Sequence, residues 1–127
     1  MSRFLWICLG GAAGTGARYL LSGWALGAFG ASFPYGTLAV NVIGSFLVGL
    51  VTQVGLATPL MSPTLRLALT TGVMGGFTTY STFNYETIRY VQDGSWPLAA
   101  ANLAITVAAC LAAGFAGIAA GRWLFGG

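Results

Sequence analysis

The sequence is poor in charge, because its 127 residues include only 5 basic and 2 acidic ones, and neither lysine nor histidine occurs. The basic residues are arginines spread along the chain, so they do not form the clustered patch that binds nucleic acid. No nucleophile, base and orienting group occur together as an active site requires. We therefore expect no nucleic-acid partner and predict that the chain is not an enzyme.

Cysteine is also scarce, since only Cys8 and Cys110 occur, and both lie in apolar stretches. Neither has a second cysteine or a histidine at the spacing that a metal site or a redox motif requires. A buried cysteine behaves as a small apolar side chain. We interpret both as packing residues.

Apolar residues, in contrast, make up 57% of the chain, which leaves too little ionic surface to solvate a globule of this size. A hydrocarbon core about 30 Å thick needs about 20 apolar residues per helix. The sequence therefore predicts an all-α integral membrane protein, in which residues 1–127 form a single domain of four transmembrane helices, at about 4–29, 35–57, 64–91 and 96–125. Arg18 interrupts the first apolar run, so we expect a retained span rather than a signal peptide.

Small residues recur four positions apart in the first and fourth predicted spans. Gly10 and Gly14 form one such stripe, and Ala113, Gly117 and Gly121 form another. Lipid provides no hydrophobic driving force between helices, so close approach depends on residues without bulky side chains. These stripes predict the contact faces of their helices.

Polar side chains also form stripes with the same spacing. Thr37, Asn41 and Ser45 share one face of the second span. The fourth span carries a matching stripe: Asn102, Thr106, Cys110 and Gly114. Each stripe has two interpretations, an interhelical hydrogen bond that joins the bundle or a row of donors that faces a polar conduit.

The middle of the third span predicts a broken helix near residues 75–79. Glycine lowers helix stability by about 1 kcal/mol relative to alanine, and threonine can bond its own backbone instead; here Gly75 and Gly76 precede Thr78 and Thr79. We expect the first half-helix to end near Gly75 with free carbonyls, and the second to begin near Thr79. The alternative is a kink in which threonine hydroxyls satisfy the backbone.

Two charged residues lie deep in the predicted spans, Arg18 and Glu86. Charge at membrane depth is costly and usually has a function. The two residues could pair with each other, or Arg18 could attract anions to a vestibule.

Three motifs occur together: GGFTTYSTF at Gly75–Phe83, GTLAVN at Gly36–Asn41, and the pair Arg18-Tyr19. In these motifs, and over essentially the whole chain in length and number of spans, the sequence resembles the Fluc family of bacterial fluoride channels. The resemblance implies a channel that passively exports fluoride across the bacterial cytoplasmic membrane. It also implies a homodimer of two subunits inserted in opposite orientations in the lipid bilayer, with two pores and one structural sodium ion at the interface.

The resemblance also implies roles for individual residues. The backbone carbonyls of Gly75 and Thr78 from each subunit would hold the sodium ion. Asn41 and Phe83 would line the fluoride pathway, and Tyr80 occupies the position of a second phenylalanine, where its ring edge is still positive. The other candidate pathway residues are polar or charged: Arg18, Thr37, Ser81, Thr82, Glu86 and Thr106.

Two other membrane functions remain open at this point. A small multidrug-exporter-like antiporter has the same size and the same possibility of dual insertion. Such transporters use a titratable carboxylate in the first span, where this chain has Arg18 and no acid. A membrane scaffold without transport activity, in which the polar stripes only join helices, is the third possibility.

Overall fold

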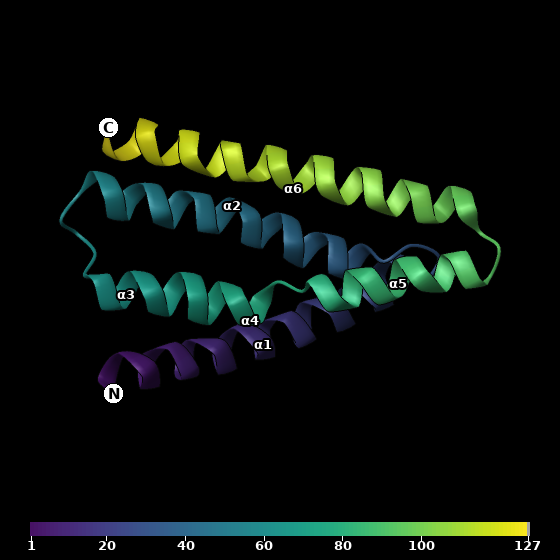
Figure 1. The fold of residues 1–127 in the computed structure, drawn as a ribbon, viewed down its shortest axis with the longest axis horizontal. Coiled ribbons are helices and arrows are strands. Elements are labelled where there is room, and N and C mark those ends of the chain that lie inside the picture. The colour runs from purple at the N-terminus through teal and green to yellow at the C-terminus, as the bar shows by residue number, and fades with distance from the viewer. Residues whose placement is uncertain (127) are drawn as a thin grey trace.

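The computed structural model describes residues 1–126, and its regular structure is all-helical. Four rods lie side by side with both chain ends at the same end of the bundle (Figure 1). The first, second and fourth rods are single helices: α1 (Ser2–Phe29), α2 (Tyr35–Ala57) and α6 (Trp96–Phe125). The third consists of four pieces: α3 (Pro63–Leu67), the π-helix η1 (Ala68–Met74), α4 (Gly75–Phe77) and α5 (Tyr80–Gln92). The prediction of four helical rods, the third of them interrupted, is confirmed.

Local sequence signals explain where the rods begin and end. Ser62 caps the third rod, because its side chain accepts a hydrogen bond from the N–H of Leu65, and Pro63 occupies the first helical turn. At the other end of this rod, Gly94 adopts a positive φ of 76°, a conformation that glycine tolerates. Each connection therefore reverses the chain direction within a few residues.

Close packing follows the predicted stripes of small residues. A β carbon on Gly14 would overlap the carbonyl oxygen of Val73 in η1, and one on Gly117 would overlap the carbonyl oxygen of Phe46 in α2. The backbones of α1 and η1, and those of α2 and α6, therefore approach more closely than larger residues would allow. The predicted contact faces of the first and fourth spans are confirmed.

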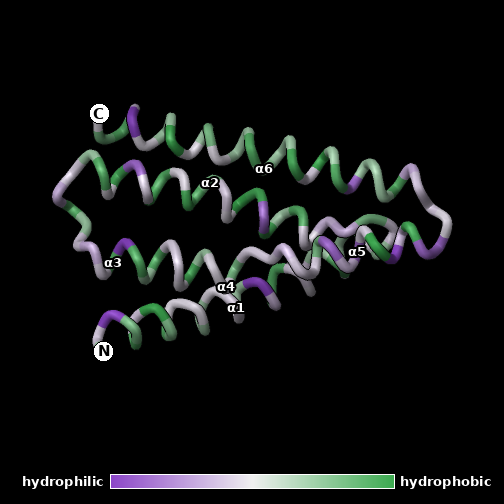
Figure 2. The backbone as a smooth tube through the Cα atoms, viewed as in Figure 1, coloured by the Kyte–Doolittle hydropathy of each residue, from purple (hydrophilic) through white to green (hydrophobic). Residues whose placement is uncertain are grey.

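The distribution of polarity is the reverse of that in a soluble bundle. Large apolar side chains such as Trp24 (62% exposed) and Phe115 (71%) face outward, whereas Asn102 is 1% exposed. Figure 2 shows hydrophobic residues along the outer side of α6. Two helices, α2 and α6, are long and apolar enough to cross a membrane by length and composition. Extended apolar surface with buried polar groups is characteristic of a membrane protein.

Candidate functional site

The third rod is interrupted by two residues with extended backbone. Thr78 has φ −86° and ψ 160°, and Thr79 has φ −151° and ψ 115°, between the end of α4 and the start of α5. Both threonines bond locally: the Thr78 hydroxyl donates to the Met74 carbonyl (2.8 Å), and the Thr79 hydroxyl oxygen accepts from the Thr82 N–H (3.2 Å). The break thus ends one helix and caps the next.

The interruption lies within the predicted range 75–79, and the first half-helix ends at Phe77, two residues beyond Gly75. Gly76 has another role at this point. A β carbon on Gly76 would overlap the carbonyl oxygen of Gly11 in α1. Gly76 therefore permits close packing against α1, whereas a β carbon on Gly75 would meet only the Thr70 carbonyl oxygen of η1, at 3.9 Å. The interruption itself occurs at the two threonines.

Asn41 of α2 holds the break through both ends of its side-chain amide. Its Oδ1 accepts from the Thr79 N–H at 2.8 Å, and its Nδ2 donates to the Thr79 carbonyl at 3.1 Å. Both backbone groups of an extended residue are thus satisfied at a depth where water is scarce. An amide nitrogen carries a second N–H, which leaves one donor for another acceptor.

The carbonyls of Gly75 and Thr78 are among those that lose, at the break, the partners that a continuous helix would provide. The regular donors to Gly75 and Thr78 are the N–H groups four residues later. Those of Thr79 and Thr82 donate instead to Asn41 Oδ1 and Thr79 Oγ1. These carbonyls are the two that the sequence resemblance assigns to sodium, and a carbonyl with a free lone pair is a fitting ligand for a hard cation.

Arg18 does not pair with Glu86. Its Nε donates to the Gly76 carbonyl at 2.9 Å, which places a guanidinium beside the C-terminal end of α4. A cation near the carbonyl end of a helix is electrostatically favourable. Arg18 therefore reaches the break from α1 and stabilises its carbonyl side.

A cavity of about 610 Å³ lies beside the break, between α2, α5 and α6. Five of its lining residues are predicted site residues, and Thr79 of the break lines it as well. The five are Asn41, Thr78, Tyr80, Phe83 and Thr106. None of the described residues that line the cavity is charged. The cavity offers neutral hydroxyl, amide and aromatic groups.

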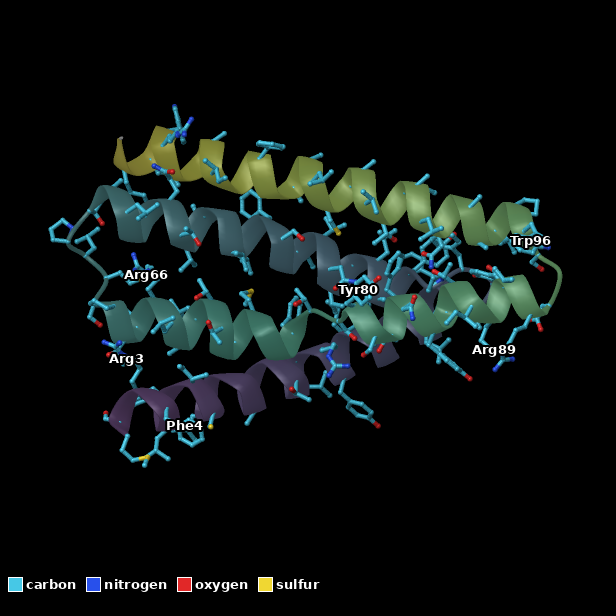
Figure 3. The ribbon with its side chains drawn as sticks, in the orientation of Figure 1. Arg3, Phe4, Arg66, Tyr80, Arg89 and Trp96 are labelled. Carbon is cyan, nitrogen blue, oxygen red and sulfur yellow. The ribbon has the colours of Figure 1, made fainter. Side chains whose placement is uncertain are left out.

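Two aromatic rings form part of this cavity. Tyr80 and Phe83 lie one turn apart at the start of α5, with ring centroids 6.0 Å apart in an edge-to-face arrangement. Phe83 is 7% exposed, whereas Tyr80 is 78% exposed. Figure 3 shows Tyr80 where the third rod is interrupted. The edge of an aromatic ring carries partial positive charge, so a ring edge can serve as a partner for a negative ligand.

Thr37 and Glu86 occupy a separate cavity of about 320 Å³, near the turn between α1 and α2. The Thr37 hydroxyl donates to Glu86 Oε2 at 3.0 Å. Among the described residues, Glu86 Oε1 is the one buried side-chain oxygen or nitrogen without a hydrogen-bond partner. The predicted pathway residues are therefore not all in one place. Asn41, Tyr80, Phe83 and Thr106 line the larger cavity, Thr37 and Glu86 line the smaller one, and Arg18, Ser81 and Thr82 line neither.

Ser81 and Thr82 lie at the first turn of α5, close to Thr79. The Thr79 hydroxyl donates to Thr82 Oγ1 at 3.0 Å, and the oxygens of Thr79 and Ser81 are 3.5 Å apart. Thr79 was not among the predicted site residues, although the structure places it at the centre. The signal that points to it is a threonine directly before a helix, since threonine is a favoured N-cap residue.

Comparisons with known proteins agree along the whole chain. A model of the family described as CrcB-like protein, Camphor Resistance (CrcB), matches residues 5–118. A protein of Sorangium cellulosum is 61% identical over 127 residues, with all of both chains covered. One from Anaeromyxobacter dehalogenans is 57% identical, and one from Geobacter sulfurreducens 52%, covering 99% and 98% of this chain and all of each relative. Each of the three relatives is named a fluoride-specific ion channel FluC.

Proposed function

The chain belongs to the CrcB-like family, and we propose that it is a fluoride-specific ion channel that lets fluoride leave the cell along its gradient. The structural observation that carries the proposal is the broken helix held by Asn41 beside a cavity lined by uncharged residues. The relatives are named as channels, in accord with the prediction that the chain is not an enzyme. Their names give no support to the multidrug-exporter alternative.

The chemistry of the cavity suits a small, strongly hydrated anion. An ion that leaves water needs replacement partners, because the loss of hydration in a low-dielectric site is costly. The second N–H of Asn41, nearby hydroxyls and the ring edges of Tyr80 and Phe83 are such partners. A wall without fixed positive charge lets the anion leave again.

The functional unit that we propose is a homodimer of two oppositely inserted subunits with two fluoride pathways. Three observations support it: Tyr80 is 78% exposed, the large cavity opens on the surface, and the Gly75 and Thr78 carbonyls of one subunit lack their regular helical donors. Two copies would bring the carbonyls of Gly75 and Thr78 together as four oxygen ligands for one structural sodium ion. The ion would join the two broken helices.

The remaining candidate residues would act outside the larger cavity. Arg18 would raise the potential near the break, and Thr37 and Glu86 would border the second cavity. Ser81 and Thr82 would extend the row of hydroxyls along α5. We propose that the protein lies in the bacterial cytoplasmic membrane, since a passive exporter must lie in the membrane that separates the cytoplasm from the exterior.

The experiment is a flux measurement on the purified protein in liposomes. A fluoride-selective electrode records efflux, and a chloride electrode records the same for chloride, with protein-free liposomes as the baseline. We expect rapid fluoride efflux and slow chloride efflux. Equal rates for the two ions would contradict selectivity, and a fluoride rate at the protein-free baseline would favour the scaffold.

A second measurement tests the alternative and the assembly. Proton-coupled uptake of a cationic dye that disappears in Glu86→Gln would support the antiporter instead. The mass of the detergent-solubilised protein should equal two chains, and a single-chain mass would refute the dimer.

A further inference from the structure

A continuous chain of hydrogen bonds connects α6 to α5 behind the larger cavity. The Thr106 hydroxyl donates to Asn102 Oδ1 at 3.3 Å, and Asn102 Nδ2 donates to Thr87 Oγ1 at 3.0 Å. The Thr87 hydroxyl in turn donates to the Phe83 carbonyl at 2.9 Å. The first and last members, Thr106 and Phe83, line the cavity, whereas Asn102 and Thr87 do not.

The residues of this hydrogen-bond chain are among the most buried polar residues of the protein. Asn102 is 1% exposed, Thr106 6% and Thr87 9%. Buried polar groups require partners, and a fully bonded network fixes the relative position of the helices that carry it. This chain of hydrogen bonds is the polar connection through which α6 holds the turn of α5 that carries Phe83.

The direction of the hydrogen bonds restricts what Thr106 can do. A threonine hydroxyl has one proton, and that of Thr106 is already donated to Asn102 Oδ1. Fluoride accepts hydrogen bonds and donates none. Donation from Thr106 to fluoride would therefore leave a buried amide oxygen of Asn102 without its donor.

We propose that Asn102 is a positioning residue, which together with Thr87 fixes Phe83 at the cavity wall. Thr106 belongs to the same chain of hydrogen bonds and does not donate to the passing ion. The proposal rests on the function proposed above and deepens it. It explains why an asparagine stands in the most buried polar position of a mostly apolar helix.

The test uses nearly isosteric variants that remove one hydroxyl each. Thr87→Val and Thr106→Val should each lower fluoride efflux about tenfold, because either one interrupts the chain. Thr87→Ser and Thr106→Ser keep the hydroxyl and should stay within about twofold of the wild type. Asn102→Leu should be at least as impaired as either valine variant.

The matched control is Thr70→Val. Thr70 also donates to the carbonyl four residues earlier, that of Arg66, at 2.8 Å, but its hydroxyl has no interhelical partner among the described residues. We expect its efflux to stay within about twofold of the wild type. The fluoride-to-chloride flux ratio is also measured, since loss of assembled protein lowers both fluxes together, whereas a displaced Phe83 lowers the ratio.

The double variant separates positioning from direct contact with the ion. If both residues act through the same chain of hydrogen bonds, the Thr87→Val, Thr106→Val double variant has the same fluoride efflux as the more impaired single variant. An unimpaired Thr87→Val beside an impaired Thr106→Val would overturn the proposal, because it would assign Thr106 to the ion. If the wild type carries no fluoride, the proposed function fails too; if it conducts and Thr87→Val matches it, only the positioning role fails.

Discussion

Replacement of Asn41 by aspartate tests the geometry of the break most directly. The variant keeps the shape of the side chain and an acceptor for the Thr79 N–H, but it has no N–H to donate to the Thr79 carbonyl, now at 3.1 Å. When ionised, it also places a negative charge in a cavity whose described lining residues are neutral. Both changes oppose the passage of an anion.

The magnitude follows from two contributions. A buried carbonyl that loses its donor costs about 1–3 kcal/mol. Repulsion between a carboxylate and an anion about 4 Å away is about 4 kcal/mol at an effective dielectric constant of about 20. Since each 1.36 kcal/mol corresponds to about tenfold in rate, the repulsion alone predicts a loss of about a thousandfold.

The assay is fluoride efflux from liposomes, with Val48→Ala as the control, because Val48 lines the same cavity from the same helix and has no hydrogen-bond donor in its side chain. We expect the control to stay within about threefold of the wild type. Asn41→Leu, which leaves both backbone groups of Thr79 unpaired, should in addition lower the thermal stability of the solubilised protein. Near-normal efflux by Asn41→Asp would refute the assignment of Asn41 to the ion pathway.

Three other variants test the surroundings of the break. Arg18→Gln removes the guanidinium charge beside the Gly76 carbonyl. It should lower fluoride efflux from liposomes at least about tenfold, and unchanged efflux would contradict this prediction. Gly44→Ala places a β carbon where the Thr78 methyl group lies, so we expect a displaced break and reduced efflux, and full activity would disprove the close contact. Gly14→Val should prevent α1 from packing on η1 and abolish the assembled species in gel filtration, and a normal elution profile would argue against that interface.

Much of the fold could be predicted because it depends on local properties of the chain. The length of apolar runs set the four rods, and the spacing of small residues identified the faces that pack. The threonine pair indicated the interruption. The glycines beside it were predicted to help end the helix, whereas Gly76 permits a close contact with α1. Glycine is compatible with both a break and a close helix contact, and the pattern by itself does not distinguish them.

The partners within the site could not be predicted in the same way. Arg18 bonds a carbonyl 58 residues away, and Asn41 bonds a peptide 38 residues away. The sequence offered Glu86 as a partner for Arg18 because opposite charges attract, but it contains no information on which groups meet. Asn102 was recognised as polar and membrane-embedded, yet its connection to Thr87 depends on how α5 and α6 lie against each other.

The sequence by itself determined that the chain forms apolar helical rods, that the third is interrupted, and which polar residues lie at membrane depth. Those properties follow from composition and periodicity along the chain. Only the tertiary structure decided that the break falls at Thr78 and Thr79 and that Asn41 holds it. The physical reason is that a hydrogen bond needs two groups within about 3 Å, and packing of distant segments alone sets that distance.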